Sequence, residues 1–428
     1  MNTRAILNRR WGVILWVLTL ATAVLSGPAP ATLSAQANSA ALHPVAPGDT
    51  WTALAYRFES DPAVLQQLNP HPNRQRQPAI GSSVRLPAEA VSRNGRLLRP
   101  YQGGLLQTAV IYNQSPWQVA LSHNLPHPYR PLLYRPLFLP GGESPPRELP
   151  LGLTDLAFSH APALPGQAIG VRVELAADRT LRGELVGAGP LIFGAGGENG
   201  RMRVGLIGTG AFFRAGEPAL LLQVEGQPAW IQPWRFVDDE WIFQQLTLTG
   251  TAAQIDQESI AQERERLFEL WSAVTPQPQW QTSFQLPIES YLTLSAPFGA
   301  RRSYNGGPYR SYHEGVDFSA YGGTPVLATT QGTVVLAEFL YVRGGAVIID
   351  HGLGIYSGYY HLSSVLAEVG QQVEPGQLIG EVGTTGLSTG NHLHWDLLVG
   401  GVWVDAAGWL ERDMGCWILA GLERPCQQ

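Results

Sequence analysis

Four histidines and one aspartate in the last third of the chain have the residue types and spacing of a hydrolytic metal centre. They are His313, Asp317, His361, His392 and His394. Two imidazoles and a carboxylate can hold a zinc ion and leave one coordination position open, while the remaining imidazoles can move protons. The sequence of 428 residues contains only 10 histidines. The four named here all lie between residues 313 and 394, and this concentration predicts a site.

The spacing of His392 and His394 favours a strand, because residues two apart on a strand project to the same side. Asp396 follows on the same face. One imidazole can then serve as a ligand and the other can transfer protons beside it. Asp396 has two open interpretations, a partner that orients a histidine or a solvated acid of the strand.

His313 and Asp317 flank Gly315. In an extended segment these three residues share a face, and the glycine leaves room for a metal between the other two. A helix with i, i+4 spacing is the alternative, but Gly315 and the β-branched Val316 disfavour it. We expect two strands to converge on one ion.

The composition suggests what must position these residues. The length favours two to four domains. A net charge of −6 argues against nucleic-acid binding, since no basic surface is available to neutralise phosphates. With 14% charged residues, 48 glycines and 33 prolines, the chain suits β-rich modules joined by turns and stiff linkers. We predict a mainly β, multidomain protein.

Residues 1–37 predict a secretory signal peptide. Three arginines precede an apolar run, Trp11 to Leu25, and the small residues Ala35-Gln36-Ala37 suit cleavage. An uncleaved membrane anchor is the alternative, although the run is short for a membrane span. Membrane contact is expected only in that case. Either way, we expect the rest of the chain to act in the cell envelope or outside the cell.

Residues 42–88 predict a small β-α-α-β unit, in which Thr50 caps one helix, Asp61 caps a second and Ile80–Pro87 forms the closing strand. The unit resembles the LysM family, and the matching pattern runs from Gly48-Asp49-Thr50 to Pro87. The resemblance implies binding to glycans that contain N-acetylglucosamine, such as peptidoglycan. A role as a spacer alone is the alternative.

Three further segments separate this module from the histidines. Residues 100–142 resemble a degenerate second LysM-like module that lacks the Gly-Asp-Thr start, so its glycan binding stays open. Residues 148–250 carry short β-branched runs broken by Gly, Pro and Asp, which is typical of an immunoglobulin-like β-sandwich spacer. Residues 251–280 predict a helical linker, which we interpret as a connecting strut.

Residues 284–412 are predicted to form the last domain, within which the segment from about Pro297 to Leu410 resembles the lysostaphin- and LytM-type zinc endopeptidases, metallopeptidase family twenty-three. The resemblance is carried by ordered runs that include His313-Glu314-Gly315-Val316-Asp317, Tyr360-His361-Leu362 and Asn391-His392-Leu393-His394. It implies the duplicated hybrid motif fold, an antiparallel β domain with a groove. It also implies hydrolysis of the stem peptides or cross-bridges of peptidoglycan.

The resemblance assigns a role to each residue of the site. It implies His313, Asp317 and His394 as zinc ligands, and His361 and His392 as the catalytic pair, with their individual roles open. Two departures flank the set: Asn391 replaces the usual Pro, and Trp395-Asp396 replaces Phe-Glu. Because no ligand is lost, we expect an active enzyme. The alternatives are a catalytically silent activator or scaffold of other peptidoglycan hydrolases, and a plain glycan-binding adhesin.

Some finer expectations concern the surroundings of the site. The groove walls are expected at Tyr304–Ser311 and Phe339–Gly345, and no rule converts these loops into a choice of bond. His351 is expected in a turn, outside the catalytic set. Residues 413–428 are expected to form a tail, in which Cys416 and Cys426 close a disulfide in an oxidising compartment or remain free thiols.

Overall fold

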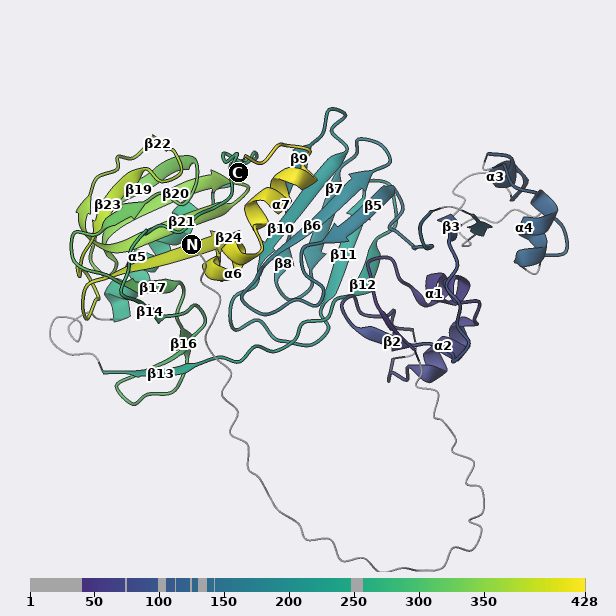
Figure 1. The fold of residues 1–428 in the computed structure, drawn as a ribbon, viewed down its shortest axis with the longest axis horizontal. Coiled ribbons are helices and arrows are strands. Elements are labelled where there is room, and N and C mark those ends of the chain that lie inside the picture. The colour runs from purple at the N-terminus through teal and green to yellow at the C-terminus, as the bar shows by residue number, and fades with distance from the viewer. Residues whose placement is uncertain are drawn as a thin grey trace, which may run out of the picture. The chain divides into compact units, whose positions relative to one another are not determined.

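The computed structural model describes residues 41–73, 75–98, 105–111, 113–123, 125–129, 137–141, 143–247 and 257–427 (Figure 1). The expected signal segment, residues 1–37, lies outside the described residues. The fold is mainly β, with 36% strand and 15% helix. Within the described ranges, no helix combines the length and the apolar character that a membrane span requires.

The first module has the predicted order of elements, with its two strands paired antiparallel. The side chain of Thr50 accepts a hydrogen bond from the backbone N–H of Ala53, and that of Asp61 accepts one from Ala63, so both predicted caps are present. Leu65 is buried in the core of the module. Its elements are β1 (Leu42–Pro44), α1 (Trp51–Arg57), α2 (Pro62–Leu68) and β2 (Ser83–Arg85).

A second unit repeats this order, and its first strand lies ahead of the predicted start at residue 100. Its elements are β3 (Gly95–Leu98), α3 (Leu105–Ile111), α4 (Pro116–Ser122) and β4 (Leu137–Pro140). Strands β3 and β4 pair antiparallel. Ser115 caps α4 through a bond from the N–H of Gln118. Whether this unit or the first one is a LysM module stays a prediction.

Two four-stranded antiparallel sheets follow, with strand orders β5-β6-β10-β9 and β12-β11-β7-β8. Buried residues of both, such as Val171 of β6 and Leu220 of β11, belong to one core, so the sheets pack face to face. The immunoglobulin-like identity stays a prediction. The strands are β5 (Leu153–Phe158), β6 (Ala168–Leu175), β7 (Leu181–Leu185), β8 (Gly189–Pro190), β9 (Ile192–Gly196), β10 (Met202–Gly208), β11 (Ala219–Val224) and β12 (Trp230–Pro233).

The C-terminal part contains a ten-stranded sheet with the central path β14-β17-β24-β21-β20-β19-β22, to which β18, β23 and β25 are attached. Every pairing in it is antiparallel. The strands are β14 (Thr293–Ala296), β17 (Val316–Ser319), β18 (Pro325–Leu327), β19 (Gly332–Leu340), β20 (Gly344–Gly352), β21 (Ile355–Val365), β22 (Gln372–Val373), β23 (Leu378–Val382), β24 (His392–Val399) and β25 (Val402–Val404).

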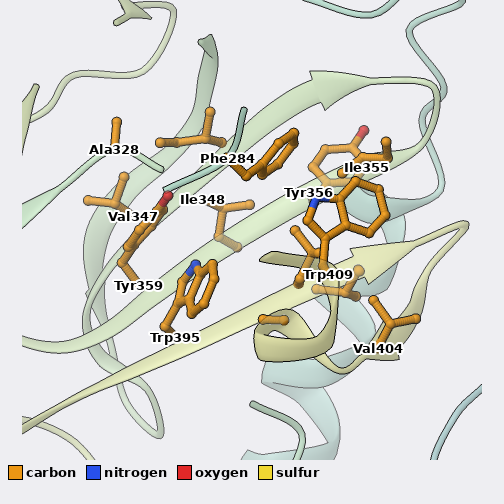
Figure 2. Close-up of a cluster of buried hydrophobic side chains, with 14 of the residues drawn as sticks. Phe284, Ala328, Val347, Ile348, Ile355, Tyr356, Tyr359, Trp395, Val404 and Trp409 are labelled. Carbon is orange, nitrogen blue, oxygen red and sulfur yellow. The ribbon is translucent and has the colours of Figure 1, made fainter. Parts of the chain in front are cut away.

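Strand β20 is buried along its whole length, which marks the centre of this domain. Figure 2 shows the aromatic part of the core, in which Tyr356 and Tyr359 of β21 gather with Trp395 of β24 and with Phe284. Trp409 joins them from α6 (Ala406–Glu411). Large rigid side chains of this kind hold neighbouring strands in a fixed register. The sheet is therefore a firm platform for the side chains on its open face.

Strand β13 (Phe243–Leu246) corrects the predicted boundary of the spacer, residues 148–250. It belongs to neither sheet of the spacer and pairs in parallel with β15 (Arg301–Tyr304), which in turn pairs with β16 (Ser311–Tyr312). The N–H of Arg301 donates to the carbonyl of Ile242 at 2.8 Å. A short strand pattern does not reveal its partner, because the partner is decided by tertiary contacts.

Helix α5 (Gln257–Trp271) lies within the predicted linker, residues 251–280, of which residues 251–256 are outside the described part. Its residues Leu267 and Trp271 are buried in the core of the C-terminal domain, as the predicted apolar face required. The helix is therefore packed on that domain along one side.

The last residues form a helix rather than the expected tail. Helix α7 (Met414–Gly421) follows Asp413, whose side chain accepts a bond from the N–H of Cys416. Ile418 and Leu419 of this helix are buried in the same core as Val204 of β10. The predicted disulfide between Cys416 and Cys426 is present, and it ties the end of the chain to α7.

Candidate metal centre

Two neighbouring strands bring the predicted ligands together. β17 and β24 pair antiparallel with Asp317 opposite His394, while His313 lies in the short connection between β16 and β17. At Gly315 an added Cβ would contact the carbonyl of Trp395 and would lie 2.7 Å from Nε2 of His394. Only glycine allows this close approach, because it has no side chain. The backbone at 315 thus passes close beside β24.

The three ligand atoms face one another. Oδ1 of Asp317 lies 2.8 Å from Nδ1 of His394 and 3.0 Å from Nε2 of His313, and the two nitrogens are 3.0 Å apart. For metal–ligand bonds of about 2.1 Å, a tetrahedral site needs ligand atoms about 3.4 Å apart. A small outward movement of each side chain would reach that spacing. Among the described residues, this trio is the group of His, Cys, Asp and Glu close enough to hold a metal.

The protonation of the trio suits a cation. Burial alone would raise the pKa of Asp317, but hydrogen bonds from His313 and His394 hold it well below its usual range. Burial lowers the pKa of His394 to about 4, against the opposing effect of Asp317. Nδ1 of His313 is 3.0 Å from the carbonyl of Pro297, so when a metal displaces the proton that Nε2 shares with Asp317, the ring keeps a proton on Nδ1 and offers Nε2 as a lone pair. The donor set therefore fits zinc: two neutral imidazoles and one carboxylate.

His361 and His392 lie beside the trio, with ring centroids 4.7 Å apart. Nδ1 of His361 is 2.8 Å from the carbonyl of Thr385, and Nδ1 of His392 is 2.8 Å from the carbonyl of Gly390. Each ring can donate a hydrogen bond from Nδ1–H to its carbonyl and keep the lone pair of Nε2 free. Nε2 of His392 is 3.9 Å from Oδ1 of Asp317.

His361 has two unusual features. Burial, followed by the nearby His392 and His394, lowers its pKa to about 3, so the ring is neutral at physiological pH. Its backbone has a φ of 62°, in the left-handed region that non-glycine residues rarely adopt. A conformation of this kind costs on the order of 1–3 kcal/mol and needs support from its surroundings.

Support for His361 comes from helix α5. The N–H of His361 donates to the carbonyl of Arg343 at 2.9 Å. Glu263 of α5 accepts bonds from the N–H groups of Val342 at 2.7 Å and Arg343 at 3.2 Å, and from Nη1 of Arg343 at 3.2 Å. Nη2 of Arg343 lies 3.7 Å from Glu314, the neighbour of His313. The helix that we interpreted as a strut thus contacts the backbone beside the site.

Asp317, His394 and the two further histidines line a groove of about 350 Å³, whereas His313 is buried and does not line it. Besides Asp317, His361, His392 and His394, its described lining comprises Gln244, Leu246, Thr247, Ser295, Ala296, Arg302, Tyr304, Ser319, Leu387, Ser388, Thr389, Gly390 and Asn391. Of the expected walls, Tyr304 lines it, whereas the described residues of Phe339–Gly345 do not. That segment instead contacts the loop 387–391, because the carbonyl of Val342 accepts a hydrogen bond from the N–H of Leu387.

Sequence reasoning missed several parts of the groove: the residues of β13 with Thr247, the loop 387–391, and the side chains of Ser295, Ala296, Arg302 and Ser319. A signal for the loop was present, since Ser388-Thr389-Gly390 directly precedes His392 in the chain and had to lie near it. No local signal identified β13. Its place depends on pairing with β15, which is distant in sequence.

Two other predicted interpretations need correction. Asp396 is 1% exposed, so it is not a solvated acid. Its Oδ2 accepts a bond from Nε1 of Trp403 at 2.9 Å, and burial raises its pKa to about 7. His351 lies in β20 and is fully buried, with Nε2 2.7 Å from Oγ of Ser357. It is a core histidine rather than a turn residue, because β20 runs one residue beyond it.

Comparison with known proteins bears on the same segment. Residues 311–406 match the family model described as Peptidase family M23. The peptidoglycan DD-endopeptidase ShyA of Vibrio cholerae is 39% identical over 127 residues, which is 29% of this chain and 30% of ShyA. The DD-carboxypeptidase/endopeptidase Mpg of Neisseria meningitidis is 39% identical over 123 residues, 29% of this chain and 28% of Mpg.

The chain thus spans less than a third of these curated relatives. Among solved structures, a peptidase M23 described as putative, from Pseudomonas aeruginosa, aligns with a TM-score of 0.44 and 25% identity, covering 58% of this chain and 94% of that one. The sequence matches to these peptidases thus lie in the C-terminal part of the chain, where the model of Peptidase family M23 matches residues 311–406.

Proposed function

We propose that this chain is a zinc metalloendopeptidase that hydrolyses peptide bonds in the stem peptides or cross-bridges of peptidoglycan. The observation that carries the proposal is the convergence of Nε2 of His313, Oδ1 of Asp317 and Nδ1 of His394. The imidazoles of His361 and His392 lie beside these atoms in an open groove. The match to Peptidase family M23, and relatives named as peptidoglycan DD-endopeptidases, support it.

His313, Asp317 and His394 would hold the zinc ion. When bound, zinc supplies a Lewis acid that polarises a carbonyl and lowers the pKa of water towards about 7. His313 is 1% exposed and Asp317 is 9% exposed, while His394 is partly exposed at the groove, and the carbonyl of Pro297 keeps His313 in the required tautomer. These residues therefore contribute charge and orientation.

His361 and His392 would move the protons. Their Nδ1 atoms face backbone carbonyls, so Nε2 of one ring can accept a proton from the attacking water. Once it has taken this proton, the Nε2–H can stabilise the oxyanion of the tetrahedral intermediate and then give the proton to the leaving amine. We assign both rings to this shared role, since each holds its Nδ1 against a backbone carbonyl.

Zinc content and fragment release test the proposal together. Wild-type protein should hold close to one zinc per chain and release fragments from purified peptidoglycan. His313→Ala and His394→Ala should lose both, whereas His361→Ala and His392→Ala should keep zinc and lose at least a hundredfold in rate. If the zinc-loaded wild type releases nothing from several types of peptidoglycan, the alternative of a silent activator or scaffold is correct.

We further propose that the chain works in the cell envelope or outside the cell, and that residues 42–88 bind its glycan strands. Support for glycan binding comes from a polar hollow lined by residues that include Trp51, Gln66, Asn69 and His71. Aromatic and amide side chains together suit a sugar ring, which has apolar faces and hydroxyl edges. Sedimentation with insoluble peptidoglycan should weaken in a Gln66→Ala, His71→Ala double variant. Unchanged sedimentation would favour a spacer role.

A further inference from the structure

Arg302 occupies a distinct position in the groove. On β15 successive side chains point to opposite faces, so Arg301 and Arg302 have different surroundings. The guanidinium of Arg301 lies 4.4 Å from the ring centroids of both Phe212 and Trp241 and serves packing. Arg302 lines the groove together with Tyr304. It is the one side chain with a fixed positive charge among the described groove residues.

The hydrogen-bonding capacity of Arg302 is largely unused. Its Nη2 is 3.3 Å from Oδ2 of Asp317 and its Nε is 3.4 Å from Oε1 of Gln244, both long for such bonds. Nη1 has no hydrogen-bond partner among the described residues. A guanidinium has five N–H donors in a planar fork that matches a carboxylate. Arg302 can therefore take a further anionic partner.

The charge of the groove favours such a partner. Apart from Asp317 and the histidines, the other described lining side chains are Gln, Asn, Ser, Thr, Tyr, Leu and Ala, which carry no charge. With zinc held by neutral imidazoles and one carboxylate, Arg302 adds to an already positive centre. Oδ1 of Asp317 faces the two histidines, whereas Oδ2 faces Arg302. A carboxylate on Arg302 would thus lie next to the reaction centre.

We propose that Arg302 is a specificity-determining residue, which binds a free carboxylate of the substrate peptide beside the scissile bond. This inference rests on the proposed function of the same groove. It selects a substrate class: peptides with a free carboxylate next to the cleaved amide, in preference to peptides amidated at that position and to uncharged glycine bridges.

Two synthetic cross-linked peptides test the inference when they differ only at that carboxylate, which is free in one and a carboxamide in the other. A charge-assisted pair of hydrogen bonds corresponds to a preference of about 10- to 100-fold in kcat/KM for the free acid. Arg302→Gln should abolish the preference, so that the two peptides have equal kcat/KM values in this variant. Arg302→Lys should retain part of it, since it keeps the charge and loses the fork.

Arg310→Gln is the matched control. Arg310 is exposed on the segment between β15 and β16 and does not line the groove, so its loss changes net charge equally and should leave the preference intact. Calorimetry in a His361→Ala background gives a readout without turnover. There, Arg302→Gln should weaken binding of the free-acid peptide and not of the carboxamide.

Three results would overturn the inference and are distinguishable. Equal wild-type rates on the two peptides would show that Arg302 does not read the carboxylate, while the proposed function stands. Loss of zinc in Arg302→Gln would show that Arg302 acts by holding Asp317. If zinc-loaded wild type cleaves neither peptide and no peptidoglycan, the proposed function is wrong and the inference fails with it.

Discussion

Replacing Glu263 by Gln should disturb the candidate metal centre, although helix α5, which carries Glu263, contributes none of the five residues of that centre. The carboxylate of Glu263 accepts bonds at both oxygens, from Val342 and from Arg343. A carboxamide has one accepting oxygen, so its NH₂ group would face an N–H group of the loop. The change keeps the size of the side chain and removes the nearer of two carboxylate charges beside Arg343, the other being that of Glu314.

The magnitude follows from burial. The side chains of Glu263 and Arg343 are 7% and 14% exposed, so removing one charge leaves the other largely desolvated. Breaking a buried pair in this way costs about 3 kcal/mol, which lowers the melting temperature by roughly 6–12 °C for a domain of this size. Because the carbonyl of Arg343 holds the left-handed backbone of His361, the rate should fall about 10- to 100-fold.

Thermal melts, zinc content and kcat measured on one preparation separate these effects. Zinc content should stay near that of the wild type, since none of the three ligands contacts Glu263 directly. Arg266→Gln on the same helix is the control, because the Arg266–Glu338 pair is 60% and 38% exposed and should contribute less than about 1 kcal/mol. If the Glu263→Gln variant has the same melting temperature and kcat as the Arg266→Gln variant, α5 serves only as a strut and our reasoning is wrong.

Three further perturbations have defined outcomes. Gly315→Ala should lower zinc affinity by at least tenfold in a chelator competition, because its Cβ would press on Trp395 and His394; wild-type affinity would contradict the close packing. Burial lowers the pKa of His351 to about 4, below its ordinary value near 6.5, so the unfolded chain binds the proton first and stability should fall as pH drops from 6.5 to 4. Melts across that range should show a smaller pH dependence in His351→Gln. Cys416→Ser opens a ring with a sequence separation of 10 and should cost about 2–3 kcal/mol in denaturant unfolding, whereas a loss under 0.5 kcal/mol would mean that packing alone holds α7.

The parts of the fold that could be predicted are those with local causes. Thr50 and Asp61 cap their helices because a short polar side chain before an apolar run satisfies free N–H groups wherever the helix lies. His392 and His394 share a strand face because side chains alternate. The resemblance implied that the five residues form one site, and in the structure each lies on or directly beside a strand of the ten-stranded sheet.

The parts that could not be predicted depend on distant partners. Residues 243–246 have the pattern of a strand whether they belong to the spacer or to the sheet of β15. Only their hydrogen bonds to β15 assign them to the groove. His351 resembles a turn histidine in Asp350-His351-Gly352, yet the turn begins two residues later and Ser357 satisfies its ring. Glu263 looks like a solvated charge on a polar helix face until Arg343 is packed against it.

Strand β13 has a consequence for work with fragments. A fragment that begins at residue 284 would retain His313, Asp317, His361, His392 and His394 but would lack Gln244, Leu246 and Thr247. Its groove would be open along one side, and β15 would gain an unpaired edge that other strands can bind. Such a fragment could bind metal normally while accepting bulkier peptides and aggregating more readily. Substrate profiles from the excised domain would then describe a less selective protein than the whole chain.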